Sequence, residues 1–151
     1  MTKEEINVLM IGNNPLELTK VFDFLMKVPS KSVNTEIAFD LKSVKALLAK
    51  FSPNYILIDD NMGRLELANV VNLFARFKKT RNVPITILKN SNYEEAFGGV
   101  AMNYILKENL SVELLFTTLK NSFVSSRAQR YLKNIYKKRR GQRFRILSTA
   151  S

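Results

Sequence analysis

The sequence predicts an α/β fold, a three-layer, doubly wound domain built on a five-stranded parallel sheet. Five short apolar or alternating runs take turns along the chain with five segments of helical periodicity. Parallel strands need long crossovers, which helices usually supply. The length of 151 residues suits one domain, and a hydrophobic content of 46% is enough for a buried core.

The five predicted strands are short. A buried strand of a parallel sheet is apolar along its whole length, because helices cover both of its faces. The second run alternates between apolar and polar residues, and the fourth has Pro84 near its start, where a strand tolerates proline. In chain order, the predicted strands are residues 6–12, 33–39, 55–58, 83–88 and 102–106.

The five predicted helices carry an apolar stripe and have recognisable ends. Asn14 is a good N-cap before Pro15, and Asp40 can cap the second helix. Pro29 and Pro53 follow the first two helices and stop them. In chain order, helices are expected after Asn14, after Asp40, over 65–77, over the poorly amphipathic segment 92–97, and from Ser111 onward.

The composition excludes several classes of protein. Without Cys there are no disulfides or thiolate metal sites, and without His there is no Ser-His or Cys-His catalytic pair and no common zinc site. Neither a GxGxxG nor a Walker-type phosphate loop is present. No apolar run approaches the ~20 residues needed to span a bilayer, and residues 1–14 do not resemble a signal peptide. We therefore expect a cytoplasmic, non-transmembrane protein that is not an enzyme.

The net charge of +11 is unevenly distributed. Glu113 is the last acidic residue, and nine basic residues follow it between 127 and 145, which leaves +2 for the rest of the chain. We expect a nearly neutral domain over residues 1–126 and a basic helical extension over 127–151. The basic residues of this extension are Arg127, Arg130, Lys133, Lys137, Lys138, Arg139, Arg140, Arg143 and Arg145.

The basic extension carries an apolar stripe of its own. Val124, Ala128, Tyr131 and Ile135 are spaced four, three and four residues apart, as in a short heptad pattern. Three kinds of partner suit such a segment: nucleic acid, an anionic membrane surface, or an acidic protein or second copy of the chain. The plain alternative is a solvated extension or the start of an output module.

The expected topology places a ligand site at one edge of the sheet. In open α/β sheets, ligands bind beyond the carboxyl ends of the strands, where the strand order reverses. In the flavodoxin-like order 2-1-3-4-5, this point lies between the first and third strands. Because adjacent strand residues point in opposite directions, we expect only one of Asp59 and Asp60 to serve this site. The residues just past the strands are Gly12-Asn13-Asn14, Asp59-Asp60-Asn61, Lys89-Asn90 and Lys107-Glu108.

Four fragments, in the right order, resemble a response-regulator receiver domain. VLMIGNNPLEL is similar to that family's VLIVDDDPLEL, YILIDDNM to LILLDINM, VPITILKN to IPVIILTA, and VAMNYILKEN to GADDYLLKP. The resemblance covers about residues 6–123 and implies two-component signalling, in which a histidine kinase partner phosphorylates an aspartate. It identifies Asp59 as the phosphoacceptor, Lys107 as the lysine that pairs with the phosphoryl group, and Tyr104 as the switch aromatic.

The chain departs from the family at the metal-binding positions. The family has two acidic residues after the first strand to hold Mg²⁺, and here these positions are Gly12 and Asn13. Mg²⁺ binds through carboxylates and dehydrates reluctantly. We therefore expect weak or absent Mg²⁺ binding and no other cofactor; if a metal is retained, Asp59 and Asn61 are its candidate ligands.

A second departure is Lys89, which replaces the family's Thr or Ser switch residue. We hypothesise that a lysine ammonium, from Lys107 or Lys89, stands where Mg²⁺ would. The chain is then an atypical receiver that works mainly as a protein-interaction module, with a possible homodimer through the face formed by 92–97, 102–106 and the last helix. The alternatives are a working phosphoacceptor at Asp59 and a nucleic-acid-binding protein that uses its basic tail.

Overall fold

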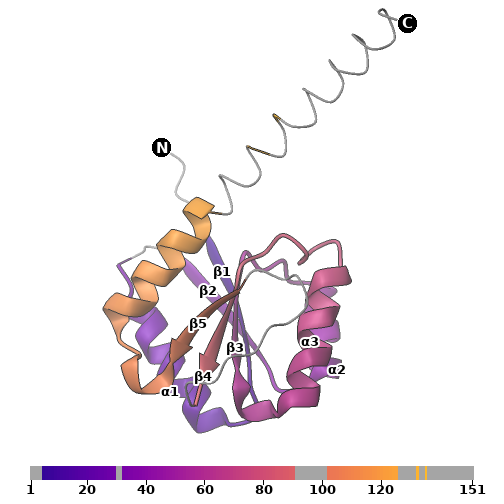
Figure 1. Cartoon of the computed structure of the whole chain (residues 1–151), viewed down its shortest axis with the longest axis horizontal. Helices are drawn as coiled ribbons and strands as arrows, with labels where there is room; N and C mark the ends of the chain where they lie inside the picture. Colours follow the sequence, from indigo (N-terminus) through magenta and orange to yellow (C-terminus); the bar gives the residue numbers. More distant parts are fainter. Residues whose placement is uncertain (1–4, 30–31, 91–101, 126–131, 133–134, 136–151) are drawn as a thin grey trace, which may run out of the picture.

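The computed structural model describes residues 5–29, 32–90, 102–125, 132 and 135. Five parallel strands form one sheet in the order β2-β1-β3-β4-β5, which confirms the predicted fold class and strand order (Figure 1). The strands are β1 (Ile6–Ile11), β2 (Val33–Ala38), β3 (Tyr55–Asp59), β4 (Ile85–Lys89) and β5 (Met102–Leu106).

Helices cover both faces of the sheet. In Figure 1, α1 and the orange helix of residues 112–125 lie on one side, and α2 and α3 lie on the other. Two short 3₁₀ turns, η1 (Asp60–Met62) and η2 (Lys107–Asn109), follow β3 and β5. No helix in the described ranges is long and apolar enough to cross a membrane. The labelled α-helices are α1 (Pro15–Met26), α2 (Leu41–Leu48) and α3 (Arg64–Arg76).

Two predicted segments lie outside the described residues. These are the helix expected over 92–97 and the basic extension over 127–151, of which only Leu132 and Ile135 are described, both as helical. The predicted domain boundary at residue 126 therefore stays a prediction.

The predicted caps are confirmed. The Asn14 side chain accepts hydrogen bonds from the backbone N–H groups of Leu16 and Glu17, at 3.1 and 3.4 Å, and opens α1. At α2, Asp40 accepts from the backbone N–H of Ser43 while the Ser43 hydroxyl lies 3.1 Å from the Asp40 backbone nitrogen. Each contact satisfies helix N–H groups that have no partner within the helix.

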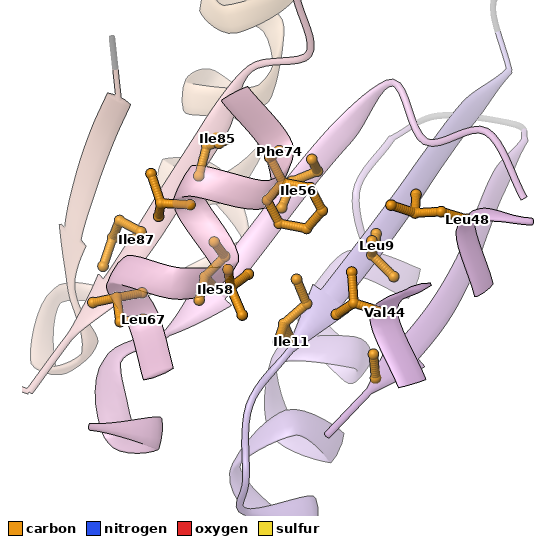
Figure 2. Close-up of a cluster of buried hydrophobic side chains, with 13 residues drawn as sticks. Leu9, Ile11, Val44, Leu48, Ile56, Ile58, Leu67, Phe74, Ile85 and Ile87 are labelled. Carbon is orange, nitrogen blue, oxygen red and sulfur yellow. The ribbon is translucent and has the colours of Figure 1, made fainter. Parts of the chain in front are cut away.

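Side-chain alternation along the strands divides the core into two clusters. Figure 2 shows the cluster under α2 and α3, where Phe74 of α3 lies over Ile56 and Val44 of α2 lies near Ile11. The opposite cluster joins the other strand residues to α1 and to the helix over 112–125. It includes Val8, Met10, Leu18, Leu25, Tyr55, Leu57, Leu115 and Leu119. Each fully buried apolar side chain contributes about 1.5–3 kcal/mol, so these two clusters hold the sheet that positions the site.

Candidate functional site

Four of the strands, β1, β3, β4 and β5, end at nearly the same level on the carboxyl side of the sheet. Ile11 of β1 pairs with Ile58, Asp59 pairs with Leu88, and Lys89 of β4 pairs with Leu106. β3 is one residue longer than predicted, so Asp59 is its last residue and its backbone is held in the sheet. The loops that follow these strands therefore bring their first residues to one edge of the sheet.

Asp59 and Lys107 form an ion pair at this edge. The Lys107 Nζ atom lies 2.7 Å from Asp59 Oδ1, and the Asp59 side chain is only 2% exposed. Oδ1 also accepts the backbone N–H of Asn61 at 2.9 Å. Asp59 Oδ2 is buried and has no hydrogen-bond partner in the described part of the chain. Burial raises the pKa of Asp59, and the contacts to Lys107 and Asn61 only partly oppose this rise.

Glu17 of α1 is a member of the site that the sequence reasoning missed. Its Oε2 atom lies 2.8 Å from Lys107 Nζ and accepts a hydrogen bond from Asn61 Nδ2. The hydrogen bond to Lys107 lowers the pKa of Glu17. Burial alone would lower the pKa of Lys107, but its hydrogen bonds to Asp59 and Glu17 outweigh burial and raise it. The amine is therefore held as an ammonium between two carboxylates.

One local signal pointed to Glu17. It lies in the first turn of the helix that follows β1, three residues after the cap Asn14, and so near the edge where the site forms. This signal is weak, because acidic residues are common in the first turn of a helix, where they complement the helix dipole. An acidic residue at this position therefore does not by itself indicate a functional site.

Asn90 and Asn61 link the charged residues into a network. The Asn90 side chain donates to both Asp60 and Asn61 through Nδ2, and its Oδ1 accepts from Lys107 Nζ at 2.9 Å. Asp60 thus reaches this network through Asn90, whereas Asp59 contacts Lys107 directly. Strand alternation ends at Asp59, because η1 turns the chain at the next residue, and Asp60 reaches the network through Asn90.

The positions of the expected acidic pair are occupied differently. Asn13 Nδ2 donates to the backbone oxygen of Asn61 at 3.0 Å. Gly12 is packed so closely that a Cβ atom there would lie 3.0 Å from Asp59 Cβ and 3.1 Å from Leu18 Cδ2. Any side chain at position 12 would require its neighbours to shift. Among the described residues, no group of three or more His, Cys, Asp or Glu side chains could hold a metal ion.

Lys89 and Tyr104, the two predicted switch positions, contact each other. The Lys89 Nζ atom lies 4.7 Å from the centroid of the Tyr104 ring, in a cation–π arrangement. Lys89 is 6% exposed and Tyr104 is 38% exposed. The contact forms because their neighbouring strands pair in parallel, with Lys89 opposite Leu106 and Ile87 opposite Tyr104.

Comparison with known proteins identifies the fold through structure alone. No family model matches the sequence, and no curated protein matches it either. Solved structures do match. The signal receiver domain of an HD domain-containing protein from Pseudomonas fluorescens aligns with a TM-score of 0.67 and 11% identity, over 83% of this chain and 99% of that one.

Two further structures align over 79% of this chain. Chemotaxis protein CheY4 of Vibrio cholerae has a TM-score of 0.66 and 21% identity, with 99% of its own chain covered. The receiver domain of sensor histidine kinase PA1611 from Pseudomonas aeruginosa, which has a magnesium ion in its active-site cleft, has a TM-score of 0.62 and 18% identity, with 98% covered. The chain therefore has the fold of response-regulator receiver domains.

Proposed function

We propose that this chain is an atypical receiver-like module of two-component signalling, which acts through protein interaction and is impaired in Mg²⁺-dependent phosphorylation. The observation that carries the proposal is the position of Lys107, whose ammonium lies 2.7 Å from Asp59 and 2.8 Å from Glu17. Two opposite unit charges ~4 Å apart attract by about 4 kcal/mol at an effective dielectric of 20, so Lys107 already offsets part of the negative charge of Asp59 and Glu17.

The residues present do not fit a Mg²⁺ site. Mg²⁺ favours octahedral oxygen ligands that include carboxylates, and Gly12 and Asn13 supply none. The backbone oxygen of Asn61 already accepts from Asn13, and Asp59 Oδ1 is already paired with Lys107. Without a divalent ion, the charge that develops during phosphoryl transfer is poorly stabilised. We therefore infer slow or absent phosphorylation at Asp59.

The proposal is tested by offering the chain a phosphodonor. The full chain is incubated with acetyl phosphate, or with beryllofluoride, in the presence of Mg²⁺, and Asp59 is examined by intact-mass measurement and by amide chemical shifts. We expect no change at Asp59. Modification of Asp59 would instead support the alternative of a working phosphoacceptor. The variant Asn13→Asp, which restores one metal-binding carboxylate, is the matched control and should gain measurable Mg²⁺ binding.

The proposed function also predicts the partners of this chain. We expect a histidine kinase or another signalling protein to bind the module, and a second copy could pair through the face of β5 and the helix over 112–125. Tyr104 and Val124 are exposed there, at 38% and 62%. Light-scattering measurement of the molecular mass over a range of concentrations tests the homodimer.

A second candidate function is nucleic-acid binding by the tail. The supporting observation is compositional, because nine basic and no acidic residues lie between 127 and 145. Proteins that bind through phosphates lose affinity as salt rises. A gel shift of the full chain across salt concentrations, beside the variant Arg139→Glu/Arg140→Glu, tests this idea. Binding that appears only with anionic vesicles would indicate a membrane surface instead.

A further inference from the structure

The hydrogen-bonding capacity of Lys107 is filled from within the protein. An ammonium has three N–H donors and no acceptor. Three oxygens lie within hydrogen-bond distance of Lys107 Nζ: Asp59 Oδ1 at 2.7 Å, Glu17 Oε2 at 2.8 Å and Asn90 Oδ1 at 2.9 Å. An oxyanion from solution can bind this ammonium only if one of the three acceptors leaves.

The three acceptors differ in how firmly they are held. Asp59 is 2% exposed and belongs to a central strand. Asn90 is anchored through both its backbone N–H and its Nδ2 to Asp60. Glu17 extends from the first turn of α1, and its side chain is 36% exposed. Asn90 is exposed as well, but it is a neutral amide tied to Asp60, so Glu17 is the charged acceptor that reaches solvent.

Glu17 also carries the charge of an oxyanion ligand. Its Oε2 atom accepts from two donors on different elements, Lys107 Nζ and Asn61 Nδ2. An ammonium and an amide that converge on one oxygen are a suitable donor set for a phosphate or another tetrahedral oxyanion. The carboxylate of Glu17 thus occupies the place of such a ligand and repels a second anion by its own charge.

We propose that Glu17 is a tethered anion that closes this site, and that removal of its charge opens an oxyanion-binding site formed by Lys107 and Asn61. The inference rests on the proposed function, because it names the residue that keeps the lysine unavailable. It also assigns α1 a role in specificity, since the exclusion of external oxyanions depends on a side chain from that helix.

The test measures binding of inorganic phosphate to the full chain without metal. Titrations followed by amide chemical shifts compare the parent protein with Glu17→Gln, which keeps the shape, and Glu17→Ala, which removes the side chain. We expect no saturable binding to the parent up to the highest phosphate concentration used, and saturable binding to both variants with an apparent Kd at least tenfold below that concentration. Asp23→Asn is the matched control, because Asp23 is an exposed acidic residue on the same helix.

Three results would overturn the inference. In the first, phosphate binds the parent as tightly as it binds Glu17→Ala. In the second, Glu17→Gln and Glu17→Ala are both folded and neither gains phosphate binding. In the third, the gain in binding persists in the double variant Glu17→Ala/Lys107→Met. Circular dichroism establishes that each variant is folded, and Glu17→Gln serves if the alanine variant is not. A parent that excludes phosphate yet is phosphorylated with Mg²⁺ contradicts the proposed function alone.

Discussion

Both ends of the sheet are rich in asparagine, but the asparagine side chains contact different kinds of group at each end. At the amino end, Asn54 Oδ1 accepts from the backbone N–H of Asn7 at 2.7 Å, and its Nδ2 donates to the backbone oxygen of Glu5 at 2.6 Å. Asn34 Nδ2 donates to the Asn7 side chain at 3.0 Å. These amides are neutral and join strand ends through ordinary hydrogen bonds.

At the carboxyl end, amides of the same kind surround charges. Asn61 and Asn90 contact Glu17, Asp60 and Lys107, and the buried Asp59 keeps one oxygen without a partner among the described residues. A buried polar atom without a hydrogen-bond partner destabilises the folded state. The amino end is joined by neutral amides, whereas the carboxyl end holds a cluster of charged side chains.

The largest effect is expected from Lys107→Met, which removes the charge that the carboxyl end is built around. The variant leaves Asp59 and Glu17 without their shared cation, and loss of one partner of a buried pair costs about 3 kcal/mol. Urea denaturation at pH 7 measures the change in the free energy of unfolding. A variant as stable as the parent would mean that the ion pair contributes nothing to the fold.

The same variant should respond to pH in a defined direction. Burial already raises the pKa of Asp59, and loss of Lys107 raises it further, so the folded state binds a proton more tightly than the unfolded chain does. The free energy of unfolding of Lys107→Met should therefore fall as pH rises from 4 to 7. The double variant Lys107→Met/Asp59→Asn should lose most of this dependence.

A smaller effect is expected from Asn54→Ala at the amino end. It leaves the backbone N–H of Asn7 and the backbone oxygen of Glu5 without their partner, at a cost of about 2 kcal/mol. The amide shifts of Asn61 and Asn90 should not change, because the two ends are independent. Shifts at those residues would show that the ends are coupled through the sheet.

Asn14→Ala should cost about 1 kcal/mol, because it removes the N-cap of α1. Asn14→Ser keeps a capping oxygen and should recover most of the loss. Thermal denaturation of the two variants measures the difference. Since Glu17 is anchored in this first turn, equal stability of the alanine and serine variants would argue against a well-formed turn beneath it.

The smallest expected effect concerns Lys89 and Tyr104. A double-mutant cycle with Lys89→Met and Tyr104→Leu should give a coupling energy of about 0.5 kcal/mol, the range for cation–π pairs that are partly exposed. Denaturation of the four proteins under one condition provides the cycle. A coupling of zero would show that the two side chains are adjacent without interacting.

Local patterns in the sequence predict much of the fold. Apolar runs of strand length alternate with helical stripes, and Asn14 and Asp40 cap the helices that follow them. These signals act over a few residues, so they can be recognised without any knowledge of the tertiary structure. Topology then predicts that Asp59 and Lys107 lie at one edge, and their 2.7 Å contact agrees with this.

The tertiary structure alone decided which side chains share that edge as partners. Glu17 contacts Lys107 across 90 positions of sequence and Asn61 across 44. Asp60 joins the network only because η1 turns the chain and Asn90 reaches across from β4. Such contacts depend on strand register and side-chain rotamers in loops from different strands. A local pattern specifies neither the register nor the rotamers. The sequence by itself therefore determined the strands and helices, and the tertiary structure decided which side chains contact Lys107.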